Sequence, residues 1–371
     1  MNNDRKESIP DLRFPQFVNV SKWKENIFEE LFTIGNGRDY KHLSAGDIPV
    51  YGSGGYMLSV NDYLYDGESV CIGRKGTIDK PIFLKGKFWT VDTLFYTHSF
   101  KNCTPNFINY VFQNIDWLKH NEAGGVPSLS KTNIYKIKVF LPDSPEQQKI
   151  ASCLSSLDEL IIAQKEKLEL LKNHKKGLMQ SLFPQEGETV PKFRFPEFEN
   201  DGEWEEKKLG DMCRSISAGK NKNSDNGAFY LYGSTGIIGN CLDPSHNGTF
   251  ILVARVGANA GFLNKIAGEF GVTDNTLILD LDEKYNLNYI YYFLEKFNLN
   301  KLVFGSGQPL ITGSQLKKIL IPISKNKLEQ QKISSCLSSL DEIITSRIEK
   351  IEKLQLHKRG LLQGLFPKII D

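Results

Sequence analysis

The chain has 371 residues, of which 40% are hydrophobic and 24% are charged, as in ordinary globular proteins. A single hydrophobic core rarely grows beyond about 250–300 residues, so this length predicts two domains. The 46 basic and 44 acidic residues leave a net charge of only +2, which excludes binding of nucleic acid through overall basicity. If the chain binds DNA, the attraction for phosphate must come from local patches or from partner subunits.

No apolar run approaches the about 18 residues that a membrane span needs, and the polar segment 1–10 lacks the apolar core of a signal peptide. We therefore expect a cytoplasmic protein with no membrane partner. The six cysteines are scattered without a Cys-x-x-Cys pair. That spacing favours free thiols over disulfides and predicts no metal site.

An internal repeat sets the organisation of the chain. Residues 145–184 and 328–367 align without a gap and are identical at 26 of 40 positions. A weaker repeat covers the rest: Ile9–Pro15 returns as Val190–Pro196, Tyr51–Ser53 as Tyr232–Ser234, and Val91–Leu94 as Thr273–Leu277. We therefore predict the order domain, helix, domain, helix, over residues 1–142, 143–184, 185–325 and 326–371. Similar helices indicate a shared partner surface, and divergent domains indicate two different targets.

The first domain is predicted to be mixed α/β. The β-rich runs 69–72 and 89–96 alternate with Gly-rich turns, and an aromatic-rich helix is expected at 106–118.

Three loops of this domain could contact DNA. The turn 52–56 offers backbone amides and hydroxyls for phosphates, and the turn 73–76 points basic groups outward. The polar loop 124–131 lies before the strand that leads into the first long helix. The alternatives are a tight turn, a solvated charged turn and a flexible connection. The candidate residues are Ser53, Tyr56, Arg74, Lys75, Ser128 and Lys131.

The segment 143–184 is predicted to be one long helix with proline at both ends. Apolar residues at three- and four-residue steps form a heptad seam, interrupted by Gln164 and Lys175. Further apolar residues, Leu160, Ile162, Leu170 and Met179, leave surface for another partner. The seam consists of Leu154, Leu157, Ile161, Leu168, Leu171 and Leu178, followed by Leu182.

The second domain repeats the design of the first with different residues. Strands are expected at 250–254 and 276–281, and a helix at 288–297. The same alternatives as in the first domain apply to its loops. The candidate DNA contacts are Ser234, Arg255, Asn259, Ser306 and Gln308.

The second long helix repeats the heptad seam, here interrupted by Arg347 and Lys358. Four to five heptads in each copy predict a coiled coil between the two helices, the alternative being that each helix packs only on its own domain. The seam consists of Leu337, Leu340, Ile344, Ile351, Leu354 and Leu361, followed by Leu365.

The direction of pairing follows from the lengths of the segments. A helix of about 37 residues spans about 55 Å, whereas the intervening domain should have a radius of gyration of only about 15 Å. A parallel pair would require that domain to carry the chain back along the whole helix, so we predict antiparallel helices. The two domains would then be related by a pseudo-twofold axis, an arrangement suited to two half-sites about 34 Å apart on a duplex.

Catalytic motifs are missing. No Gly-x4-Gly-Lys-Ser/Thr loop for a nucleotide occurs, and no Asn-Pro-Pro-Tyr string of an adenine methyltransferase. Asp92 and its repeat at Asp274 and Asn275 have no nearby base, nucleophile or metal ligand, which favours a turn-capping role. The carboxylate and lysines of Glu206–Lys208 follow no apolar strand, unlike a nuclease site. We therefore expect no catalytic residue in this chain.

Taken together, these features resemble the specificity (S) subunit of type I restriction–modification enzymes over nearly the whole chain. The resemblance lies in the duplicated Glu-Gln-Gln-Lys-Ile helices, the Phe-Pro closures, and Asp66–Ile78 with Val91–Leu94. The second domain departs from the family pattern at Ala254 and at Val256–Ala258, which puts equivalent contacts there in doubt.

The resemblance implies an α+β protein in which two target recognition domains, joined by two long antiparallel coiled-coil helices, recognise a bipartite asymmetric site on double-stranded DNA. The helices would dock two methyltransferase subunits, and restriction subunits join in some complexes. S-adenosylmethionine, ATP and Mg would be bound by those partners and not by this chain. Two other functions stay open from the residues alone: a free-standing DNA-binding regulator, and a scaffold that binds only proteins.

Overall fold

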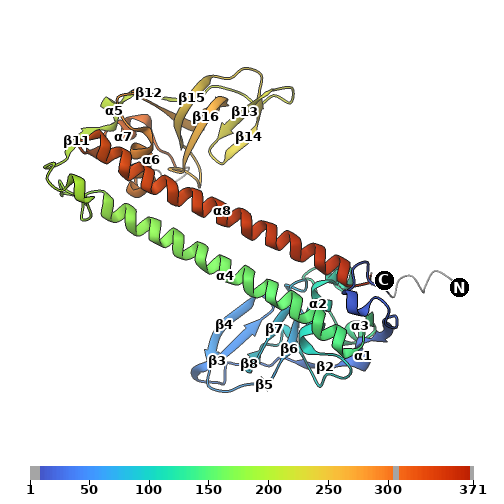
Figure 1. The fold of residues 1–371 in the computed structure, drawn as a ribbon. Helices are drawn as coiled ribbons and strands as arrows, with labels where there is room; N and C mark the ends of the chain where they lie inside the picture. Colours follow the sequence, from blue (N-terminus) through green and yellow to red (C-terminus); the bar gives the residue numbers. More distant parts are fainter. Residues whose placement is uncertain (1–8, 304–308, 368–371) are drawn as a thin grey trace. The chain divides into compact units, whose positions relative to one another are not determined.

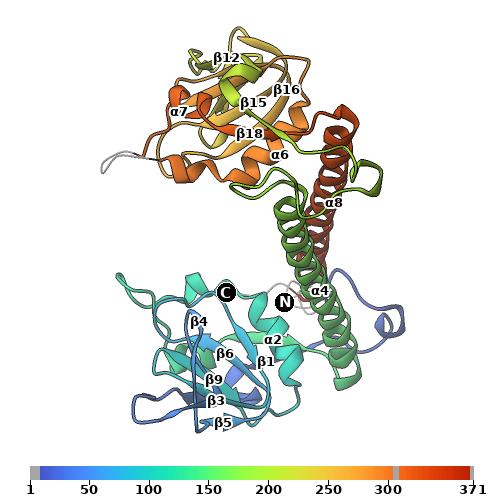
Figure 2. The same ribbon diagram turned by 90° about the vertical axis from the view of Figure 1, so that its left-hand side faces the viewer.

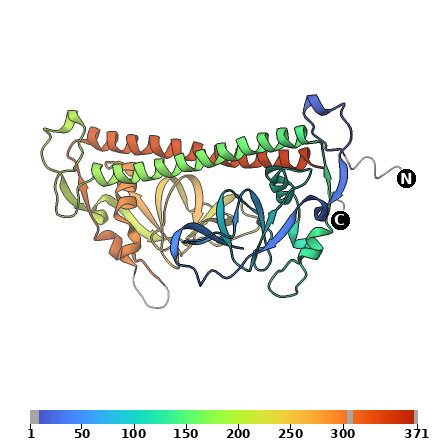
Figure 3. The ribbon, with the colours of Figure 1, turned by 90° about the horizontal axis from the view of Figure 1, so that it is seen from below.

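The structure, a computed structural model, describes residues 9–303 and 309–367. The chain divides into two compact units: unit 1 comprises residues 1–165 and 349–371, and unit 2 comprises residues 166–348. Each unit contains one α/β domain and half of each of two long helices, α4 (Ser144–Leu182) and α8 (Lys327–Leu365) (Figure 1). Both helices have 39 residues and run without a break (Figure 3).

The domain of unit 1 contains two four-stranded sheets and a two-stranded ribbon. The sheets have the strand orders β2-β9-β6-β7 and β4-β3-β8-β5, and β1 pairs with β10. The strands are β1 (Lys24–Ile27), β2 (Thr33–Asn36), β3 (Ala45–Gly52), β4 (Gly55–Val60), β5 (Tyr65–Asp66), β6 (Ser69–Gly73), β7 (Ile82–Leu84), β8 (Lys87–Thr90), β9 (Leu94–His98) and β10 (Lys138–Leu141), and the helices are α1 (Phe28–Leu31), α2 (Pro105–Gln113) and α3 (Lys131–Tyr135).

The domain of unit 2 has the same connections in one six-stranded sheet, β12-β17-β15-β16-β13-β14, with β11 paired to β18. Its strand β16 pairs with both β15 and β13, whereas unit 1 uses β7 and β8, separated at Gly86, for these two pairings. The elements are β11 (Glu205–Lys208), β12 (Cys213–Ala218), β13 (Phe229–Gly233), β14 (Gly236–Cys241), β15 (His246–Ala254), β16 (Leu263–Val272), β17 (Thr276–Leu281), β18 (Leu320–Ile323), α5 (Leu209–Met212), α6 (Leu287–Phe297) and α7 (Gly313–Lys317).

The two aromatic-rich helices form where the sequence predicts them. Side chains of Thr104 and Asn286 accept hydrogen bonds from backbone amides in the first turns of α2 and α6. Helix α2 is shorter than the predicted 106–118, because it ends at Gln113 and a separate 3-10 helix follows at Trp117–His120. The predicted strand 89–96 is also interrupted, by the turn between β8 and β9.

The long helices pair in antiparallel fashion within each unit. In the core of unit 1, Ile150 and Leu154 from the start of α4 pack with Leu362 and Leu365 from the end of α8. In the core of unit 2, the end of α4 packs with the start of α8 in the same way. All twelve predicted seam residues are buried or half-buried. Each helix also packs against a domain, as α4 does against α2 (Figure 2), but the alternative that each helix packs only on its own domain is wrong, because the helices pair in both units.

One residue expected on the outer surface is in the core. Met179 is 7% exposed and packs in unit 2, so it is not available to another partner. Leu160, Ile162 and Leu170 are exposed, as expected. No helix among residues 9–303 and 309–367 is long and apolar enough to cross a membrane.

Candidate nucleic-acid interface

The three candidate loops of unit 1 meet on one surface. The backbone of Arg74 donates to Thr93 O at 2.8 Å and accepts from Leu129 N at 2.9 Å. The amide of Gly76 donates to Pro127 O at 2.9 Å, and a Cβ atom on Gly76 would lie 3.2 Å from Oγ of Ser53. The turn 73–76 therefore joins the β3–β4 turn on one side to the 121–130 loop on the other.

The 73–76 turn, the 121–130 loop and the β8–β9 turn line an open groove that contains four of the six predicted contacts of unit 1, whereas Ser53 and Tyr56 are not part of its lining. Its exposed cations are Arg74 and Lys75, neither of which forms an ion pair within the described part of the chain. Side chains that can accept or donate to base edges stand beside them. The groove is lined by Asn36, Arg74, Lys75, Asp92, Thr93, Phe95, Glu122, Ala123, Val126, Ser128, Leu129, Ser130 and Lys131.

The 121–130 loop is bridged by its own hydrogen bonds. Oδ1 of Asn121 accepts from the amides of Ala123 at 3.1 Å and Ser128 at 2.9 Å. Oε1 of Glu122 accepts from Ser130 N at 2.6 Å, and the Ser130 side chain caps α3. The apolar side chain of Val126, 57% exposed, lies on this hydrogen-bonded loop.

Lys131 has a different environment from that of the other cations. Its Nζ atom donates to Ile34 O at 2.6 Å and lies 5.7 Å from the centre of the Phe95 ring. Burial, and then the charge of Arg74, lower the pKa of Lys131. Burial followed by the charge of Lys131 lowers the pKa of His98, so this imidazole adds little positive charge near neutral pH. The Lys131 side chain is therefore engaged by Ile34 and Phe95. Arg74 and Lys75 are the exposed cations of the groove that can contact a phosphate or a base.

Unit 2 repeats the backbone of this site with other side chains. Arg255 N donates to Asn275 O, and Ile311 N donates to Arg255 O, both at 2.9 Å. Val256 pairs with Leu310 where unit 1 pairs Lys75 with Ser128. The sequence pattern predicted that the second domain differs from the first at Val256.

The remaining candidates of unit 2 differ in exposure. Asn259 is exposed, whereas Arg255 and Ser234 are half-buried. The buried Nε atom of Arg255 has no hydrogen-bond partner among the described residues. Ser306 and Gln308 lie outside the described residues.

The β3–β4 and β13–β14 hairpins carry exposed apolar residues just after their turns, and the sequence interpretation named only Tyr56 among them. In the β3–β4 hairpin, Tyr56 and Met57 are exposed, and in the β13–β14 hairpin Ile237 and Ile238 occupy the same positions. A Cβ on Gly52 would lie 3.0 Å from Sδ of Met57, so a larger residue there would require the exposed Met57 side chain to shift. The sequence contains a signal for these residues: apolar side chains follow Gly52 and Gly233 at the same distance along the chain. The turns therefore present apolar surface beside the amides considered for phosphate binding.

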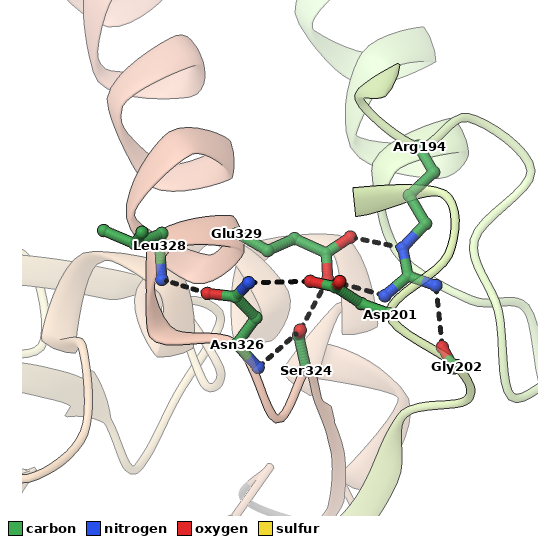
Figure 4. Close-up of polar contacts among 7 residues, drawn as sticks. All are labelled: Arg194, Asp201, Gly202, Ser324, Asn326, Leu328 and Glu329. Carbon is green, nitrogen blue, oxygen red and sulfur yellow. Dashed lines mark hydrogen bonds and ion pairs between the residues drawn. The ribbon is translucent and has the colours of Figure 1, made fainter. Parts of the chain in front are cut away.

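A buried ion pair fastens the start of each long helix. Arg194 donates from Nε and Nη2 to Glu329 at 2.7 and 2.9 Å, and the two side chains are 7% and 1% exposed (Figure 4). Ser324 also donates to Glu329, and the Asn326 side chain accepts from Leu328 N in the first turn of α8 (Figure 4).

The same ion pair occurs in unit 1, where Arg13 binds Glu146 through Nε and Nη2, both at 2.7 Å. The segments that carry the two arginines also bond to helix ends. Leu12 N donates to Gly364 O at 2.7 Å, and Phe193 N donates to Ser181 O at 2.9 Å. The repeated Arg-Phe-Pro segments therefore hold the end of one long helix to the start of the other.

A family of known proteins matches the chain twice, once in each half of the repeat. The family model described as "Type I restriction modification DNA specificity domain" matches residues 20–173 and again residues 201–355. The MjaVIII specificity subunit of Methanocaldococcus jannaschii is 28% identical over 364 residues, covering 83% of this chain and 79% of the relative. The EcoprrI specificity subunit of Escherichia coli is 22% identical over 320 residues, covering 81% and 76%.

Solved structures share the fold. The S subunit of a type I restriction–modification system from M. genitalium aligns with a TM-score of 0.71 at 15% identity, over 98% of this chain and all of that one. A chain from a study of complex assembly and conformational transition in the type I R-M system aligns with a TM-score of 0.55 at 14% identity, over 94% and 98% of the two chains.

Proposed function

The chain belongs to the type I restriction–modification DNA specificity family, and on this premise we propose that its two domains recognise the two halves of a bipartite asymmetric DNA site. As a specificity subunit it supplies sequence recognition, and the catalytic activities of the complex reside in other subunits. Its partners are accordingly DNA and the other subunits of the system.

The observation that carries the bipartite proposal is one backbone design with two sets of side chains. Arg74 and Arg255 make the same backbone contacts in their units, yet Lys75 is replaced by Val256 and Ser128 by Leu310. Different donors and acceptors at equivalent positions recognise different base edges. The exposed Tyr56, Arg74 and Lys75, with the half-buried Ser53 and Ser128, would serve one half-site. The exposed Asn259, with the half-buried Ser234 and Arg255, would serve the other.

We propose that the long helices dock two methyltransferase subunits, one on each copy of the repeat. Support comes from apolar side chains that the seam leaves uncovered: Leu160 and Ile343 occupy the same position of the repeat and are 41% and 47% exposed. Two similar surfaces suit two identical partners. Those partners would bind S-adenosylmethionine, restriction subunits would bind ATP and Mg, and the complex would work in the cytoplasm, where the host DNA is.

The test is a methylation map in a host that lacks endogenous adenine methylation. The chain is expressed with the methyltransferase subunit of its own system, and N6-methyladenine is mapped across the genome. We expect methylation at one motif of two fixed half-sites separated by an unspecified spacer, and none when either gene is omitted. Methylation that does not depend on this chain would overturn the proposal.

A further inference from the structure

Two charged residues occupy positions where the leucine seam is interrupted, and each lies in a polar cluster. In unit 1, Lys358 Nζ of α8 lies 2.6 Å from Asp158 Oδ1 of α4 and 3.0 Å from Gln113 Oε1. The hydroxyl of Tyr110, on α2 of the domain, donates to Oδ2 of the same Asp158 at 2.9 Å. We call this set of side chains the charged junction of unit 1.

Unit 2 contains the same junction with the two long helices exchanged. Lys175 Nζ of α4 lies 2.7 Å from Asp341 Oδ1 of α8 and 2.9 Å from Glu295. The hydroxyl of Tyr292, on α6 of the domain, donates to Asp341 at 2.7 Å. Each lysine also lies over the ring of its tyrosine, at 5.1 Å in unit 2 and 5.5 Å in unit 1. The arrangement is therefore a conserved part of both copies, although the domains around it have diverged.

Stability alone does not explain these lysines. The side chains of Lys175 and Lys358 are only 11% and 17% exposed, so each loses most of its hydration. Burying an ion pair gives little net stability compared with apolar residues of similar size. Polar residues in a helix seam more often select one register and one partner orientation.

The charge pattern distinguishes the two possible directions of pairing. Asp158 and Asp341 are separated by the 183-residue shift of the repeat, as are Lys175 and Lys358. A parallel pair in register would place aspartate beside aspartate and lysine beside lysine. The antiparallel pair places each lysine beside an aspartate, whereas the leucines alone fit either direction.

Two tyrosines connect the charged junctions to the domains. Tyr110 and Tyr292 come from the helices that form the base of each domain, so the carboxylate that fixes the helix register also bonds the domain. Burial raises the pKa of both tyrosines, and their hydroxyls stay protonated as donors to aspartate.

We propose that Lys175 and Lys358, with Asp341 and Asp158, are positioning residues that set the direction and register of the helix pair, and thereby the spacer length that the protein accepts between its half-sites. The inference rests on the proposed function, because the spacer is defined only for a bipartite site. On this proposal, the two charged junctions determine the spacer length, and the leucine seam does not.

The test compares methylation maps of the reconstituted complex with and without junctions. In the apolar variant, Lys175→Met, Asp341→Leu, Lys358→Met and Asp158→Leu remove both ion pairs and make these positions of the seam apolar. We expect the complex to assemble and keep its half-site sequences. Methylation at sites with one base pair more or less in the spacer should rise about tenfold relative to the native spacing, a loss of about 1.4 kcal/mol of discrimination.

Controls separate the possible failures. Lys172→Met, which removes an exposed ion pair with Glu169 on α4, should leave the spacing unchanged. Exchanging the charges of both junctions, Asp158→Lys with Lys358→Asp and Asp341→Lys with Lys175→Asp, should keep strict spacing, because lysine again meets aspartate only in the antiparallel direction. Unaltered spacing in the apolar variant, or relaxed spacing in the exchanged variant, would overturn the inference. If the unmodified complex shows no bipartite motif, the proposed function fails instead.

Discussion

Arg74 and Lys75 are neighbours in sequence, but the groove of unit 1 gives them different surroundings. Arg74 is anchored by two backbone hydrogen bonds beside Thr93 and Leu129, while the backbone of Lys75 bridges to Ser128. A guanidinium can bind a guanine through two hydrogen bonds, whereas a lysine serves a phosphate as a point charge.

We predict that Arg74→Ala weakens binding of the cognate site by about 1–3 kcal/mol and relaxes specificity at one base pair of one half-site. Lys75→Ala should weaken binding equally at all sequences and reduce its salt dependence. Binding isotherms at several salt concentrations and a methylation map check both. Lys80→Ala, an exposed lysine outside the groove, is the control. Equal loss at all sequences for Arg74→Ala would show that Arg74 contacts phosphate only.

The buried pair of Arg194 and Glu329 is expected to govern the stability of unit 2. Arg194→Ala leaves a carboxylate that is 1% exposed without its partner, which should cost about 3–5 kcal/mol of unfolding free energy. Arg214→Ala removes the exposed pair with Glu283 and should cost about 1 kcal/mol or less. Urea unfolding of the full chain measures both. Similar losses for the two variants would mean that the buried pair has no special role.

Individual site residues could be predicted from the sequence where both copies of the repeat keep them. Their long-range contact partners could not be predicted. Arg74 and Arg255 were found because both copies keep them. The partner of Glu146 is 133 positions away at Arg13, and no local spacing connects the two. Met57 and Ile238 were missed because an exposed apolar residue on a hairpin has the same periodicity as a buried one.

Among the elements, the two long helices carry the clearest signal. A heptad repeat constrains burial over the whole element, so the twelve seam residues could be predicted, as could the antiparallel direction from the lengths of the segments. Lys175 and Lys358 could be located as interruptions but not explained, because their tyrosine partners come from the domains. The division of one strand into β7 and β8 at Gly86 could not be predicted either, because the matching Gly268 also has a positive φ and yet β16 continues through it.

The seam predicts the outcome of charge insertion. Ile351 is buried and Leu168 is half-buried, so Leu168→Glu with Ile351→Glu places two carboxylates in an apolar seam and should abolish assembly with the methyltransferase. Circular dichroism and size-exclusion chromatography of the complex follow the loss. Leu356→Glu, at a position that is 63% exposed, should leave the fold of the chain intact. Normal assembly of the double variant would contradict the pairing of the helices.

At the scale of the whole molecule, we propose that two related domains recognise unlike half-sites and that one helix pair controls their spacing. The fold class and this division follow from the repeat, whereas the bases recognised do not, since they depend on side-chain positions in divergent loops.

A chain with two copies of the first domain tests this account most directly. Residues 23–141 replace residues 204–323, which begin at the matching Trp204 and end at the matching end of β18. Methylation mapping of this chain with its methyltransferase should give a symmetric motif, in which the first half-site is followed by its own reverse complement at the native spacing. An unchanged asymmetric motif, or a direct repeat of the half-site, would contradict the account.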